Sequence, residues 1–185
     1  MAVRTLTVIM ALPYFLLILQ SFFGVLTPEK ESINWRSRRV LTWADFKAKP
    51  VETAPNAAMT STSILIDFGY DNAAMHYHLS CVFYPEKSWS KVSSARILGH
   101  EQGHFDVSQL FTRKMHKALS NYTFSRATAD RDIKAIYQKV ATEQSKYQAL
   151  YDQQTNYSRD ATEQAAWEIK IKQELSDLVA FADYP

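Results

Sequence analysis

Hydrophobic residues follow two different spacings in the two halves of this chain. Between residues 63 and 83 they occupy every second position, which is typical of strands with one buried face. From residue 94 onward they recur every third or fourth position, which is typical of amphipathic helices. Strands followed by helices predict an α+β fold, with N-terminal antiparallel strands before one long helix and two further helices.

The alternating region predicts a β-hairpin. Ser63–Phe68 and Met75–Phe83 would be its strands, and Gly69–Asn72, after the first strand, favours a turn. His76 and His78 share one face of the second strand and could bind a metal, but we favour an exposed polar face. An edge strand of this kind could also pair with an extended peptide. Before the hairpin, residues 35–46 predict a strand and a short turn.

Three helices are expected in the second half of the chain. The first would span Ser94–Ser120 with Ser93 as its N-cap, and the second would span Asp130–Asp152. The third would begin at Asp160–Glu163, where an N-cap acid followed three residues later by glutamate resembles a capping box.

Composition favours one globular domain over residues 29–185. Hydrophobic residues make up 46% of the chain and aromatic residues 13%, which is unlike a disordered protein. The net charge is +2 and there is no long basic run, so we expect no nucleic-acid partner. Cys81 is the single cysteine, which excludes an internal disulfide.

The N-terminal residues 1–28 predict an export signal. Arg4 precedes an uncharged, mostly apolar stretch that runs from Thr5 to Pro28. This stretch is longer than the apolar core of about 7–15 residues in a cleaved signal peptide and approaches the ~20 residues that span a bilayer. The pattern fits a cleaved signal peptide or an uncleaved signal anchor, with the rest of the chain facing out of the cytoplasm. We therefore expect a periplasmic, extracellular or membrane-anchored protein.

The predicted first helix contains the motif H-E-x-x-H, formed by His100, Glu101 and His104. Residues four apart lie on the same face of a helix, so both imidazoles can bind one zinc ion. Glu101 lies about 100° around the helix, beside the metal, where a general base for a water molecule is needed. Zinc also requires a third protein ligand, and the loop 153–159 between the last two helices could deliver it.

The helix places both histidines on its apolar side. That position would shield a metal site, and it also suits two core histidines with an unrelated glutamate. Gly99 and Gly103 line a strip beside them, where another backbone or a substrate could approach closely. The opposite side is polar, and it includes Asp106, which argues against Asp106 as a ligand. The other polar residues of that side are Arg96, Gln102, Gln109, Arg113, Lys114 and Lys117.

Four segments together resemble a known family. The motif segment Gly99–Asp106, with Leu41–Phe46 and Ser88–Trp89 before it and Tyr151–Asn156 after it, is similar to the DUF922 family of predicted secreted zinc-dependent proteases. The resemblance covers roughly residues 35–170. It implies that His100 and His104 bind zinc and that Glu101 is the catalytic carboxylate.

The chain departs from the family pattern at one position. Family members often carry a histidine shortly after the Tyr-Asp-x-x-Thr stretch, and that histidine would be the third ligand. Here the position is Tyr157. Tyr157 is one candidate for the third ligand, although a phenolate binds zinc less commonly than a carboxylate does. Asp152 is the other candidate, because a carboxylate oxygen is an ordinary zinc ligand. Either residue could instead orient an imidazole, or the site could have lost its metal.

The resulting hypothesis is an exported zinc-dependent peptide hydrolase with a single zincin-like metalloprotease domain over residues 29–185. Zinc would activate a water molecule, Glu101 would act as the general base, and the substrate would be a peptide or protein. The alternative is an exported binding or structural protein whose H-E-x-x-H site is structural or degenerate.

Overall fold

The computed structural model describes residues 4–6, 32–38, 40–71 and 73–185. The expected export signal, residues 1–28, lies outside the described residues except for Arg4–Leu6, so its role stays a prediction. Within the described ranges, no helix combines the length and the apolar character needed to cross a membrane.

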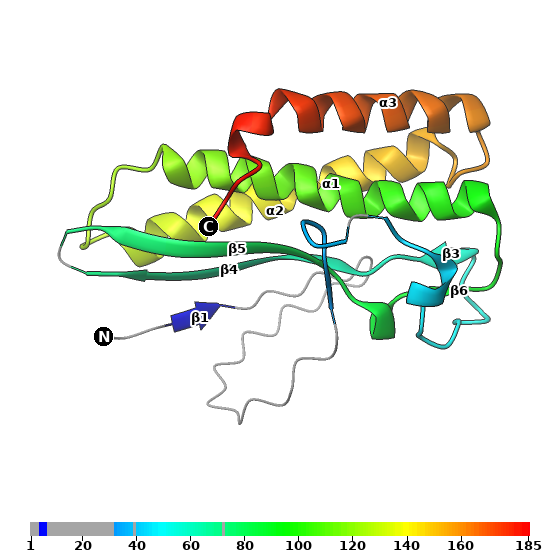
Figure 1. Ribbon diagram of the computed structural model, residues 1–185, viewed down its shortest axis with the longest axis horizontal. Helices are drawn as coiled ribbons and strands as arrows, with labels where there is room; N and C mark the ends of the chain where they lie inside the picture. Colours follow the sequence, from blue (N-terminus) through cyan, green and yellow to red (C-terminus); the bar gives the residue numbers. More distant parts are fainter. Residues whose placement is uncertain (1–3, 7–31, 39, 72) are drawn as a thin grey trace.

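Two antiparallel sheets lie on one side of the described structure (Figure 1). The larger sheet has the strand order β1-β4-β5-β2, and the smaller one pairs β3 with β6. The strands are β1 (Arg4–Leu6), β2 (Ile33–Asn34), β3 (Ala58–Met59), β4 (Thr62–Tyr70), β5 (Met75–Phe83) and β6 (Trp89–Ser90).

The predicted hairpin is confirmed, because β4 and β5 pair along their whole length. Its turn lies two residues later than expected, between Tyr70 and Met75. Gly69 continues β4 opposite His76, and the chain reverses after Asp71, whose carboxylate accepts the backbone N–H groups of Ala73 and Ala74. His78, like His76, lies on the exposed face of β5, as its alternation predicts.

Three helices lie on one side of the larger sheet: α1 contacts β4 and β5, and α2 and α3 pack against α1 (Figure 1). They are α1 (Ala95–Ser120), α2 (Ala129–Gln154) and α3 (Ala161–Asp177). The N-cap of α1 is Ser94 rather than Ser93, whereas α3 begins as predicted. There, the Asp160 carboxylate accepts the N–H groups of Thr162 and Glu163. The antiparallel strands followed by three helices confirm the predicted α+β fold.

The prediction that α1 has a polar side opposite the histidines fails over the middle of the helix, where the polar residues are buried. Asp106, Gln109 and Arg113 are 6%, 0% and 8% exposed. The helix contacts β4 and β5 on one side and α2 and α3 on the other, so little of its middle faces water. Its polar groups bind other parts of the chain instead: Trp35 Nε1 donates to Asp106 at 2.7 Å, and Tyr184 Oη donates to Gln109 at 2.9 Å.

The expected strand within residues 35–46 is also wrong. The strand is β2, which ends at Asn34, and a turn follows it. Next comes a 3₁₀ helix (Trp43–Asp45), in which the Asp45 carboxylate accepts the N–H of Thr42 at 2.7 Å. Local hydrogen bonds of this kind compete with a strand for the same backbone. Two more 3₁₀ helices are Pro85–Lys87 and Val179–Phe181.

Candidate metal centre

The α1 helix places His100 and His104 one turn apart on the face that meets α2. Their rings lie nearly perpendicular, with centroids 4.8 Å apart. Phe105, directly after the motif, is fully buried and anchors this half of the helix to the core. The two imidazoles are therefore held side by side by rigid secondary structure rather than by a loop.

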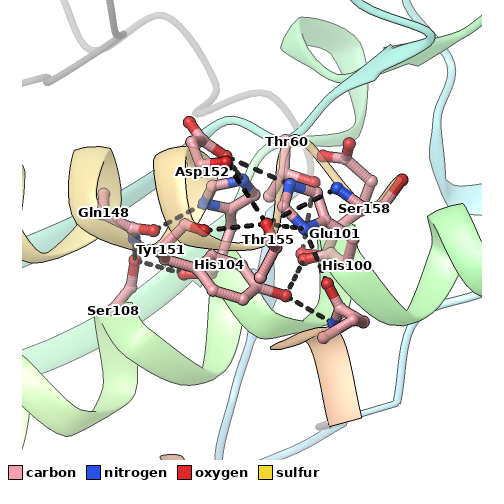
Figure 2. A network of polar contacts seen from close by, with 11 residues as sticks. Thr60, His100, Glu101, His104, Ser108, Gln148, Tyr151, Asp152, Thr155 and Ser158 are labelled. Atoms are coloured by element: carbon pink, nitrogen blue, oxygen red, sulfur yellow. Dashed lines mark hydrogen bonds and ion pairs between the residues drawn. The ribbon is translucent and has the colours of Figure 1, made fainter. Parts of the chain in front are cut away.

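Asp152, in the last turn of α2, brings a carboxylate to both imidazoles. Its Oδ1 lies 3.1 Å from His100 Nε2 and 3.0 Å from His104 Nε2. Figure 2 shows this carboxylate against both rings. The candidate ligand atoms of these three residues all lie within 4.8 Å of one another. Two nitrogens and one carboxylate oxygen form a donor set that suits zinc.

The electrostatics of this cluster favour a positive charge at its centre. Burial disfavours the charged form of His104, but the hydrogen bond and charge of Asp152 outweigh that effect and raise its pKa to about 9. Burial likewise opposes the charge of Asp152, yet hydrogen bonds from both histidines hold its pKa well below the usual range. A proton or a metal cation can supply that positive charge.

The cluster is open to solvent on one side. The side chain of His100 is 5% exposed, that of His104 is 17% exposed, and that of Asp152 is 29% exposed. A water molecule or another small ligand would therefore reach the cluster past Asp152, while His100 forms its buried wall.

Glu101 lies beside the cluster without being part of it. The residue is only 4% exposed, and its charge contributes to the raised pKa of His104. Within the described part of the chain, its carboxylate has no hydrogen bond or ion pair. Outside the helix hydrogen bonds of α1, its backbone carbonyl accepts from the Thr60 hydroxyl at 3.4 Å. Its oxygens are not among the fully buried atoms without a partner in the described part of the chain, so this carboxylate is accessible to a group that enters the site.

The space beside the glycines, expected to let another backbone or a substrate approach, is occupied by side chains of α2 and α3. The side chain of Tyr151 from α2 occupies the space beside Gly103, and its ring stacks on His100 with centroids 4.6 Å apart. Its hydroxyl donates to the His100 carbonyl at 3.2 Å. The space beside Gly99 is bounded by the Glu168 carboxylate of α3. The glycines therefore let α2 and α3 approach α1 closely.

Two glutamines that the sequence analysis did not single out contact the imidazoles. Gln148 Oε1 lies 2.5 Å from His104 Nδ1, and Gln164 Oε1 lies 3.0 Å from His100 Nδ1. Gln148 precedes Asp152 by one turn and shares its helical face. The spacing of Gln148 and Asp152 on one helical face is the signal in the sequence that could have placed Gln148 at the site. Gln164 lies on a different helix, α3, so its sequence spacing gives no such signal.

Tyr157, the other candidate for the third ligand, does not join the cluster. It lies in a loop where Asn156, Tyr157 and Ser158 all have positive φ angles, an uncommon conformation for residues other than glycine. Tyr157 is 54% exposed, and the Arg159 guanidinium lies over its ring. The geometry therefore favours Asp152 as the third donor, supplied by the helix rather than by the loop.

Comparison with known proteins yields one match. A family model described as "Bacterial protein of unknown function (DUF922)" matches residues 84–159. No curated protein and no solved structure matches the chain. The matched range contains the motif, Asp152 and Gln148, and it ends before α3. Of the four segments that carried the resemblance, Leu41–Phe46 lies outside it. This match, which spans the two helices that bear the site, supports the resemblance to the DUF922 family.

Proposed function

We propose that this protein is a zinc-dependent hydrolase of peptide bonds, acting outside the cytoplasm. The observation that carries the proposal is the convergence of His100, His104 and Asp152, with the buried Glu101 carboxylate beside them. Catalytic zinc sites typically have three protein ligands and one open position, whereas structural zinc sites are closed by four. The described residues supply three, which favours catalysis over the structural alternative.

The donor set fits zinc, and His100, His104 and Asp152 would hold the ion. A bound zinc ion supplies Lewis acidity, lowering the pKa of a water ligand to about 7 and polarising a carbonyl. Glu101 would take the proton from the attacking water and return it to the leaving nitrogen. Because no hydrogen bond or ion pair among the described residues engages that carboxylate, it is free to carry out both transfers.

The substrate class and the location rest on the sequence. The resemblance implies a protease, and the apolar stretch within residues 1–28 implies export. A peptide would approach from the Asp152 side, because His104 and Asp152 are the more exposed members of the cluster. We propose no nucleic-acid partner, in keeping with the small net charge of +2.

Cleavage of a mixed peptide library by the full chain tests the proposal. Wild type is compared with Glu101→Gln, and Glu143→Gln on the exposed face of α2 is the matched control. We expect Glu101→Gln to retain zinc, measured by elemental analysis, and to lose cleavage by a factor of about 10²–10⁴. The control should cleave like wild type. Equal rates for wild type and Glu101→Gln would refute the proposed mechanism.

A further inference from the structure

We infer that Gln148 and Gln164 are positioning residues that hold both histidines with their Nε2 lone pairs available to a metal ion. Each amide oxygen accepts from an Nδ1–H group, which leaves Nε2 unprotonated in the neutral ring. The inference rests on the metal-binding part of the proposed function and not on its hydrolytic part. The orientation of each glutamine amide follows from its own hydrogen-bond neighbours.

The orientation of the Gln148 amide follows from a backbone group. Gln148 Nε2 lies 3.0 Å from the carbonyl oxygen of His104, which can only accept a hydrogen bond. The NH₂ end of the amide must therefore face that carbonyl, and the oxygen end faces His104 Nδ1 at 2.5 Å. An amide oxygen is only an acceptor, so Nδ1 of His104 carries the hydrogen.

The orientation of the Gln164 amide follows from a carboxylate. Gln164 Nε2 donates to Glu168 Oε1 at 3.0 Å and to the Tyr151 hydroxyl at 2.8 Å. Its oxygen therefore faces His100 Nδ1 at 3.0 Å. The Thr155 hydroxyl, 3.5 Å from the same Nδ1, gives its own hydrogen to the Tyr151 carbonyl and can only accept from the ring. Both neighbours thus require a hydrogen on His100 Nδ1.

The two assignments have one common consequence. With Nδ1 protonated on both neutral rings, two Nε2 lone pairs face the same Asp152 oxygen at 3.0–3.1 Å. Three electron-rich atoms so close together require a positive charge among them, which a metal ion or a proton on one Nε2 can supply. The glutamines come from different helices, α2 and α3, so both helices must be docked on α1 before the metal-binding geometry is complete.

A purely structural role for the glutamines is the competing interpretation, because both are buried, at 5% and 4% exposure. A neighbouring residue separates the two interpretations. Gln144 lies one turn before Gln148 on α2, and its amide donates to the Ser108 hydroxyl at 3.0 Å, with no hydrogen bond to a histidine among the described residues. Gln148 also reaches that hydroxyl, at 3.5 Å. Gln144→Met is therefore a matched control for Gln148→Met.

Zinc affinity of the full chain, measured by competition with a chromogenic chelator, is the first readout. Removing a residue that orients a metal ligand typically weakens metal binding by about 10–100-fold. We expect that loss for Gln148→Met and Gln164→Met, and a change of less than about threefold for Gln144→Met, which orients no ligand. Equal losses for Gln148→Met and Gln144→Met would overturn the inference.

The histidine ring nitrogens of the zinc-loaded wild type, observed by ¹⁵N NMR, give the second readout. Zinc on Nε2 and a hydrogen on Nδ1 in both rings support the inference, and zinc on Nδ1 of either ring overturns it. Tight zinc binding through Nε2 without peptide cleavage would refute the hydrolytic function alone. A wild-type chain that binds no zinc would overturn both.

Discussion

Tyr151 occupies the space that any side chain at position 103 would need. A Cβ atom added to Gly103 would lie 2.3 Å from the Tyr151 hydroxyl oxygen and 2.8 Å from its ring carbon Cζ. Contacts below 3.0 Å require one group to move, and this ring is fixed between His100 and Trp167. The glycine is therefore required by the packing of α2 against the motif.

Gly103→Ala should destabilise the protein and disturb the metal centre. Overpacking a core typically costs about 1–3 kcal/mol, which exceeds the ~1 kcal/mol that alanine gains over glycine within a helix. Gly99→Ala is the control, because its Cβ would meet only the Glu168 carboxylate, at 3.4 Å. Urea unfolding should show a loss for Gly103→Ala and little change or a gain for Gly99→Ala. Equal stabilities would contradict the packing argument.

Asp152→Asn should lower the zinc content of the full chain, whereas Tyr157→Phe should leave it unchanged. The Asp152 carboxylate lies against both imidazoles, while Tyr157 is half-exposed beside Arg159. Elemental analysis after purification and dialysis measures the bound zinc. Loss of zinc from Tyr157→Phe would instead identify the phenol as the third ligand.

Zinc binding should depend on pH through His104. Zinc needs a neutral imidazole, and the pKa of His104 in the folded, metal-free chain is raised to about 9 by Asp152, against the effect of burial. Below pH 9, binding must displace a proton, so the apparent affinity should rise up to about tenfold per pH unit until it levels off. Calorimetric titration in buffers of different ionisation enthalpy measures the released proton. An affinity that is flat between pH 6 and 9 would exclude this coupling.

The metal-free protein should lose stability as the pH rises. His104 has a pKa of about 6.5 in an unfolded chain and about 9 when folded, so its proton stabilises the folded state. That contribution is complete below about pH 6.5 and disappears as the pH passes about 9. The contribution of Asp152, whose pKa is lowered, disappears only in acid. Urea midpoints of chelator-treated wild type should fall across this range. Asp152→Asn should flatten the dependence of the urea midpoint on pH. An unchanged slope in that variant would mean that another group causes the pH dependence.

Cys81 should resist thiol reagents in the native protein. Its side chain is fully buried, and burial raises the pKa of the thiol far above its ordinary value. A chromogenic disulfide reagent should label it only at urea concentrations that unfold the chain. Rapid labelling in native buffer would mean that β5 opens readily.

Local geometry explains what could be predicted from the sequence. His100 and His104 lie together because helical spacing alone determines it, and the β4–β5 hairpin follows from the alternation of its own residues. Asp152 was one of two candidates for the third ligand. Separating it from Tyr157 required knowing that α2 extends to Gln154 before the chain turns away.

The missed features all depend on how helices pack. The buried polar residues of α1 were expected in solvent, because a periodic pattern does not reveal that a helix is covered on both sides. Gln164 lies 64 positions from His100, and only the docking of α3 brings them together. Gly103 was expected to let another backbone or a substrate approach, and the Tyr151 side chain from α2 occupies that space.

The donors of the cluster come from α1 and α2, with Asp152 separated from His100 by 52 positions. An unfolded chain cannot hold these groups together, so a metal ion would bind the native state preferentially and add to its free energy of unfolding. At a free zinc concentration about 100-fold above the dissociation constant, that addition is about 2.7 kcal/mol. The thermal lifetime of the protein would then follow the zinc supply of its compartment, and chelation would expose it to proteolysis.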